Sequence, residues 1–239
     1  RCRSMNILKL ELKKTNIKPY FLSAIAVFVC IMGLTYILAW VPHLDSGDKN
    51  AAILFSTYQG IAAICNAIAL MSFSILASAM GYRYLTKEYC GVGAILLFSY
   101  PINRKSVVWA KAAVILLFIS TAMFLTEYGG FLIFIGTDSV LQMVNDTLVP
   151  GDFMLAFRNA LVLVCLADGI ALCAIRIGFI KKSNSVTIIS AVILSMLLIN
   201  PVAAINEQFL PVLFLAAAAL IGGILLTLNV SHKVKRMEI

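Results

Sequence analysis

Three polar side chains interrupt the long apolar runs of this 239-residue sequence. Asp168 lies near the middle of one run, Asn66 lies inside another, and Glu127 precedes Gly129-Gly130 near the end of a third. An ionised side chain within a membrane is costly unless it faces a cavity or finds a partner, so such residues often mark functional sites. The sequence therefore predicts that Asp168, Asn66 and Glu127 are candidates for a translocation path.

Plainer roles remain open for two of them. Asp168 would also suit a purely structural role in a helix bundle, either as a neutral acid or paired with Asn66 or with Arg176, which follows about two turns later. Glu127 would suit an acid whose carboxylate reaches the lipid headgroups, and the sequence favours that interpretation over an exit pathway.

Recognisable catalytic motifs are absent from the sequence. It contains no GxxxxGK[S/T] phosphate loop, no HExxH and no GxSxG, and its only histidines are His43 and His232. The six cysteines include no CxxC pair and no metal-ligand spacing. We therefore expect no catalytic residue, no metal site and no cofactor on this chain. An intramembrane enzyme, which would need paired acids or a Ser/His set at one depth, is disfavoured.

The composition predicts an all-α polytopic membrane protein. Hydrophobic residues make up 62% of the chain and charged residues only 13%, too few to cover a soluble fold. Apolar runs of about 20 residues recur, and each is long enough to cross a bilayer as a helix. We expect one transmembrane domain over residues 1–239 with six spans: Tyr20 to Val41, Phe55 to Met80, Val107 to Phe131, Ala160 to Ile177, Val186 to Leu198 and Leu210 to Leu228.

The charges predict the orientation of these spans. With both termini in the cytoplasm, all but Lys49 and Arg158 of the 19 lysines and arginines lie on the inner side. The net charge of +8 therefore records membrane orientation rather than a nucleic-acid partner. Seven acids lie at or beyond the outer side: Asp45, Asp48, Glu127, Asp138, Asp146, Asp152 and Glu207.

Three shorter features complete the expected organisation. Residues 1–19 form a cytoplasmic segment that is either an interfacial helix on anionic lipid or an extension of the first span. Small residues along the second span predict that it faces other helices. The fifth span is followed by Asn200-Pro201 and then Pro211, which predicts either a broken re-entrant helix or, preferably, a tight outer hairpin.

The loop over residues 81–106 contains a short apolar helix that cannot span a bilayer. Ala94 to Tyr100 is helix-compatible, and Pro101 ends the helix before the next span begins. Basic residues lie on both sides of it. Such a helix fits either an apolar groove on a partner protein or the lipid surface.

This loop resembles that of the type-2 ATP-binding-cassette exporter permeases. Those proteins have a glutamate and a glycine before a Leu-rich helix that ends in Ser-x-Pro-[Ile/Val]-x-Arg, followed by a lysine at the next span. The matching residues are Glu88, Gly93, Ser99, Pro101, Ile102, Arg104 and Lys111. The family commonly has Gly-Thr before the helix, where this chain has Gly91-Val-Gly-Ala.

The resemblance implies a coupling helix that docks on a separate ATPase subunit. The coupling site would comprise Glu88, Gly93, Leu96, Leu97, Phe98, Ser99, Pro101, Arg104 and Lys105. It further implies two ATPase copies that carry ATP and Mg²⁺, a second permease copy in a homodimer, and a bacterial cytoplasmic membrane. The expected cargo is a hydrophobic or amphipathic peptide. The alternatives are drug or ion efflux within the same family, and a membrane scaffold that transports nothing.

Overall fold

The protein is described here from a computed structural model, which covers residues 17–44, 55–87, 104–141, 143–144 and 149–236. Within these ranges the regular elements are all helical, and six helical units are long and apolar enough to cross a membrane. This confirms the predicted fold class. Helical backbone is expected in such segments because lipid offers no hydrogen bonds to exposed N–H and C=O groups.

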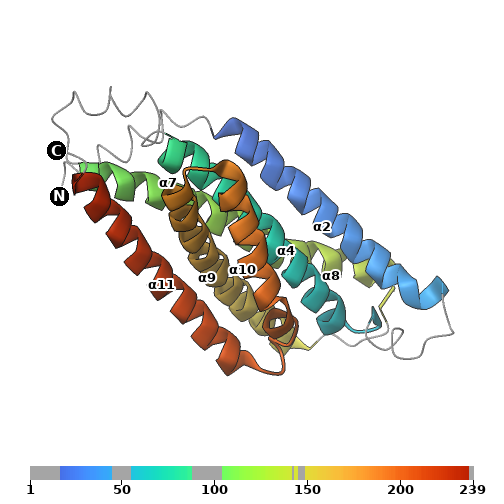
Figure 1. Cartoon of the computed structure of the whole chain (residues 1–239). Coiled ribbons are helices and arrows are strands. Elements are labelled where there is room, and N and C mark those ends of the chain that lie inside the picture. The colour runs from blue at the N-terminus through green and yellow to red at the C-terminus, as the bar shows by residue number, and fades with distance from the viewer. Residues whose placement is uncertain (1–16, 45–54, 88–103, 142, 145–148, 237–239) are drawn as a thin grey trace, which may run out of the picture.

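The six units run back and forth along one bundle axis (Figure 1). The first two are α2 and α4, the second of which continues into the π-helical turn η1. The third consists of α7, the π-helical turn η2 and α8, and three single helices follow. Their bounds are Lys18–Leu44 for α2, Tyr58–Gly81 for α4, Tyr82–Thr86 for η1, Arg104–Phe124 for α7, Leu125–Gly129 for η2, Gly130–Leu141 for α8, Pro150–Lys181 for α9, Asn184–Ala203 for α10 and Phe209–Arg236 for α11.

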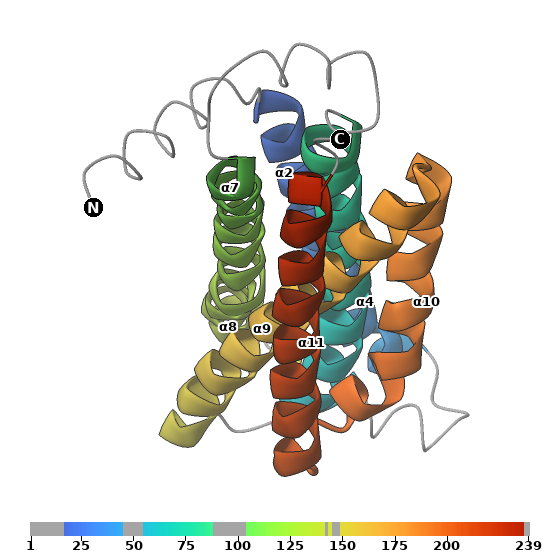
Figure 2. The same cartoon turned by 60° about the vertical axis from the view of Figure 1, so that its left-hand side comes forward.

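Helices α4 and α9 form the centre of the bundle. Figure 2 shows α9 crossing the other helices obliquely, with α11 and α10 on either side of it. Phe73 of α4 and Leu163 and Leu166 of α9 have no exposed surface. Outward-facing residues of α2 and α11, such as Phe21 and Phe214, are large, apolar and exposed, as lipid contact requires. The prediction that the second span faces other helices is confirmed.

Two glycines of α9 let neighbouring helices approach closely. A Cβ at Gly169 would lie 2.6 Å from the backbone carbonyl carbon of Ala219 in α11. A Cβ at Gly178 would lie 1.8 Å from Oγ1 of Thr187 in α10. Small residues at such crossings allow the extensive van der Waals contact that holds helices together in a membrane.

The third and fourth spans are longer than the sequence predicted. The third continues past the expected end at Phe131 to Leu141, and the fourth begins at Pro150 rather than Ala160. The stretch between these two predicted spans is therefore largely helical rather than a loop. Polar residues made these segments look like loops, but Asp138 is buried, where it accepts hydrogen bonds from the Tyr58 hydroxyl and the Met143 N–H.

Residues 204–208 join α10 to α11 in a tight hairpin, as preferred from the sequence. Helix α10 includes Pro201 and ends at Ala203, five residues beyond the predicted Leu198. The Ala204 N–H donates to the Asn200 carbonyl, and Gln208 donates to Ala204. Because Val202 and Ile205 are fully buried, the turn is anchored in the bundle.

Charge is distributed unevenly between the two ends of the bundle. We call the end where α2 begins and α11 finishes the terminal end, and the other the distal end. In the described ranges, every lysine and arginine except Arg158 lies toward the terminal end. Glu127, Asp138, Asp152 and Glu207 lie toward the distal end, and Asp168 lies near the middle of α9.

Candidate functional site

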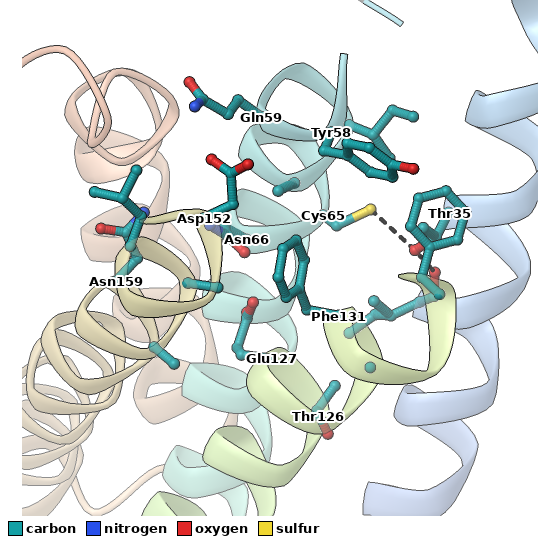
Figure 3. Close-up of a pocket in the computed structure, with 18 of the residues that line it drawn as sticks. Thr35, Tyr58, Gln59, Cys65, Asn66, Thr126, Glu127, Phe131, Asp152 and Asn159 are labelled. Atoms are coloured by element: carbon teal, nitrogen blue, oxygen red, sulfur yellow. Dashed lines mark hydrogen bonds between the residues drawn. The ribbon is translucent and has the colours of Figure 1, made fainter. Parts of the chain in front are cut away.

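A cavity of about 80 Å³ opens in the distal half of the bundle. It is lined by residues of α2, α4, η2, α8 and α9 together with Asn206 of the hairpin (Figure 3). Its walls are mostly aliphatic or aromatic, including Tyr58, Phe131 and Phe134, and a few polar groups converge on it. A concave apolar site with convergent polar groups is the usual form of a binding site.

Glu127 and Asn66 face each other across this cavity (Figure 3). With the Asn66 amide turned so that its nitrogen faces acceptors, it donates to Glu127 Oε2 at 2.5 Å and to the Ala62 carbonyl at 3.1 Å. Glu127 Oε1 is enclosed by protein and has no hydrogen-bond partner. A buried carboxylate oxygen left unpaired is expensive, so this atom is the best marker of a missing ligand.

The backbone turn η2 aims Glu127 into the cavity. Leu125–Gly129 is π-helical, and Gly130, with which α8 begins, donates its N–H to the Thr126 and Glu127 carbonyls. Single π-helical turns inside α-helices occur frequently at functional sites. Gly130 lies against α2, where an added Cβ would be 3.3 Å from the sulfur of Met32.

Amide side chains form one side of the cavity. Asn159 of α9 is 5% exposed and donates to Asn206 Oδ1 at 2.6 Å, which ties α9 to the hairpin. Arg158 donates to Asn159 Oδ1 at 3.3 Å, and its guanidinium lies 3.9 Å from the centroid of the Phe209 ring. These contacts hold the guanidinium outside the lining of the cavity. Asp152, which does line it, accepts from the Val149 N–H in the first turn of α9.

The cavity therefore has more acceptors than donors. Thr35 and Thr126 donate their hydroxyls to backbone carbonyls of their own helices, at 2.8 and 2.9 Å. Glu127 and Asp152 contribute carboxylates, whereas no lysine, arginine or histidine belongs to the lining. The site is suited to a ligand that brings positive charge and N–H groups.

The other buried acid, Asp168, lies elsewhere and is not part of this cavity. The Ser120 hydroxyl of α7 donates to Asp168 Oδ2 at 2.6 Å. Asp168 Oδ1 and one nitrogen of Arg176 are buried without hydrogen-bond partners. The sequence had suggested Asn66 or Arg176 as the partner of Asp168, but the hydrogen bond is made by Ser120 instead, because the neighbouring turns of α7 and α9 pack together.

The structure thus separates the three residues predicted to share a path. Asn66 and Glu127 meet in one cavity, and Asp168 does not join them. The favoured interpretation of Glu127 as an acid at the headgroups is wrong, because η2 directs its carboxylate toward α4 and not toward lipid.

The predicted coupling site falls mostly outside the described ranges. Residues 88–103, with Glu88, Gly93, Leu96, Leu97, Phe98, Ser99 and Pro101 among them, are not described. Arg104 and Lys105 form the first residues of α7. The structure describes the two helical ends that flank the loop, so the coupling helix stays a prediction.

Sequence reasoning missed several lining residues. Asp152 was predicted only as an acid at the outer side, and Asn159 and Asn206 were not singled out; the structure places Asp152 and Asn159 in the first ten residues of α9 and Asn206 in the hairpin after α10. The sequence does contain a pattern that could have predicted these lining residues, because amides and acids accumulate toward the distal ends of the second, third and fourth spans. The described residues contain no group of three or more His, Cys, Asp and Glu side chains suited to a metal ion.

Comparison with known proteins yields one informative similarity. The chain is 25% identical over 198 residues to a Bacillus subtilis (strain 168) protein named "Uncharacterized protein YcbO", across 81% of this chain and 83% of that protein. No protein-family model and no solved structure matches the chain.

Proposed function

We propose that this chain is the membrane permease subunit of an ATP-driven exporter of the ATP-binding-cassette class. Two copies would act with two ATPase subunits, which bind ATP and Mg²⁺ and perform the hydrolysis. The observation that carries this proposal is the loop between α4 and α7, in which Glu88, Gly93 and the Ser99-to-Arg104 segment match the coupling helix of those permeases.

The helical ends that flank this loop support the proposal. Helix α4 continues through η1 to Lys87, with Leu85 and Thr86 buried in the bundle and Arg83 and Lys87 exposed. The start of the loop is thus anchored to the bundle. A push on the loop would be transmitted to α4 and to α7, two of the helices that line or flank the distal cavity.

The charge asymmetry supports the orientation that such a subunit needs. Lysines and arginines concentrate on cytoplasmic segments, so the terminal end would face the cytoplasm and the cell membrane of a bacterium would be the host membrane. The loop and the ATPases would then share one side, and the distal cavity would face outward.

The dimensions of the cavity bear on the cargo. A volume of about 80 Å³ is far too small for a peptide. We therefore place the path of a hydrophobic or amphipathic peptide between two copies of the chain rather than within one. Ion or small-drug efflux is a second candidate, which the small, acceptor-rich cavity favours.

Co-purification tests the proposal most directly. The full chain is purified in mild detergent together with the ATPase encoded nearest to its gene, as wild type and as the double variants Arg83→Glu/Lys87→Glu and Arg104→Glu/Lys105→Glu. We expect a complex with ATPase activity for wild type and its loss in both variants. The matched control is Lys181→Glu/Lys182→Glu, which makes the same charge change in the exposed turn between α9 and α10.

The control separates a docking site from a general charge effect. If the control variant loses the complex to the same degree, the loop has no special role. If wild type binds no candidate ATPase, the exporter assignment fails and a membrane scaffold takes its place.

A further inference from the structure

The exporter proposal does not account for the unpaired oxygen of Glu127 in the distal cavity. We infer that it is a binding site for a small organic cation, specifically a primary ammonium group on a short carbon chain. Its recognition would rest on Glu127 for charge and on the surrounding aromatic and aliphatic walls for the carbon part. This inference does not rest on the exporter proposal.

The first step concerns charge. Glu127 Oε2 is bonded to Asn66, but Oε1 is enclosed and has no partner, and the lining offers no basic side chain. Arg158, which precedes the lining residue Asn159, donates to the Asn159 side chain and stacks on the Phe209 ring. The second acid, Asp152, already lies in the first turn of α9, where the helix N-terminus stabilises its charge. An enclosed carboxyl group without a basic neighbour can take up either a proton or a cationic ligand, and the cationic ligand is the case inferred here.

The second step concerns hydrogen bonds. An ammonium group has three donors and no acceptor. Thr35, Thr126 and Asn159 already donate to other protein groups, so these donors do not serve Glu127 Oε1. A ligand N–H would supply the donor that Glu127 Oε1 lacks, and the charged pair would form a short, strong hydrogen bond.

The third step distinguishes an organic cation from a metal ion. Alkaline-earth ions are usually held by several carboxylates together, whereas Glu127 and Asp152 are the only two acids in the lining and the described residues contain no group of three or more His, Cys, Asp and Glu side chains. The lining instead consists mostly of carbon atoms, with Phe131 beside Glu127 and Tyr58 farther away (Figure 3); Phe134 also belongs to the lining. Aromatic faces attract ammonium groups and pack against the attached carbon chain.

The fourth step concerns size. The volume of about 80 Å³ is about half that of a cavity known to hold benzene, roughly 150 Å³. That space suits a short alkylammonium or the amine end of a larger molecule. A free amine and the ethanolamine headgroup of a lipid share this chemistry.

The test measures thermal stability of the full chain in nanodiscs of phosphatidylcholine, which has no primary amine. Ethylammonium chloride is titrated at constant ionic strength and pH, with ethanol as the neutral counterpart and sodium chloride as the inorganic cation. We expect ethylammonium alone to raise Tm in a saturable manner, since a ligand that binds only the folded state stabilises it. Glu127→Gln should abolish the shift.

The matched control is Asp168→Asn, an acid in the middle of α9 that neither lines the cavity nor bonds a lining residue. It should keep the ethylammonium shift even if its basal Tm falls. Glu127→Asp keeps the charge but shortens the side chain, so it should retain the shift with half-saturation at higher concentration. If Glu127→Gln does not fold, the higher half-saturation concentration of Glu127→Asp still tests whether Glu127 binds the ammonium group.

Four results would overturn the inference: no shift in wild type, an equal shift in Glu127→Gln, an equal shift with sodium, or stabilisation by lower pH alone. The last result would mean that Glu127 binds a proton and no ammonium group.

Nanodiscs that contain phosphatidylethanolamine separate the two sources of amine. A raised basal Tm with no further ethylammonium shift identifies the lipid headgroup as the ligand. An unchanged ethylammonium titration identifies a free amine. Neither readout requires an ATPase, so failure here is distinct from failure of the exporter proposal.

Discussion

Two buried acids of this bundle show how differently the same kind of residue can be used. Asp168 lies where α9 is packed against α7 and α11, and it accepts a hydrogen bond from Ser120 at 2.6 Å. Glu127 lines a cavity and Asp168 does not, although each acid has one buried oxygen without a hydrogen-bond partner. We call the surroundings of Asp168 the packed region and the surroundings of Glu127 the hollow region. A buried charge in a membrane segment is therefore only a starting point, since the surrounding helices decide its role.

The largest effect should come from disturbing the packed region. Replacing Gly169 by Val places new atoms against the backbone of Ala219, which a side-chain rotation cannot relieve. We expect the free energy of unfolding to fall by about 3 kcal/mol, at the upper end of usual overpacking costs. The measurement is reversible unfolding in mixed micelles, or Tm where unfolding is irreversible.

Gly222→Val provides the control for this change. It adds the same atoms to α11 at a glycine with open space within 4 Å of the new Cβ. We expect little change in the free energy of unfolding, or a gain of less than about 1 kcal/mol, because valine has a higher helix propensity than glycine. Equal costs for both variants would show that the α9–α11 crossing is less tightly packed than described.

A middle-sized effect should come from the Ser120–Asp168 pair. Ser120→Ala leaves Asp168 Oδ2 without its donor, which should cost about 1–3 kcal/mol of stability because the acceptor stays buried. Asp168→Ala added to Ser120→Ala should recover part of that loss, since both polar partners are then gone. A double-mutant cycle measures the coupling, and a coupling energy near zero would argue that the two side chains do not interact.

The smallest effect should come from the hollow region, and with the opposite sign. Glu127→Gln keeps a side chain that can bond Asn66 and removes the unpaired charge. We expect the free energy of unfolding to stay unchanged or to rise by up to about 1 kcal/mol. A loss as large as that of Ser120→Ala would contradict the contrast drawn between the two acids.

Sequence reasoning recovered the six spans because their signal is local. Each apolar run is long enough to cross a bilayer, and only helices satisfy the backbone there. It failed at the distal ends, where Asp138 and Asp152 made helical segments look like loops. Those acids are satisfied by the Tyr58 hydroxyl and by backbone N–H groups, which hydropathy cannot register.

The sequence also determined the charge difference between the two ends, because consecutive spans alternate in direction and the basic residues fall at alternate junctions. The tertiary structure alone decided which polar residues meet. Asn66 and Glu127 are 61 positions apart, and the π-helical turn η2 and the crossing of α4 bring them within 2.5 Å. Asp168 accepts a hydrogen bond from Ser120 because α7 packs on α9. The direction of each helix follows from the sequence. The rotation of a helix about its axis depends on contacts between distant segments, so only the tertiary structure shows which polar side chains bond to each other.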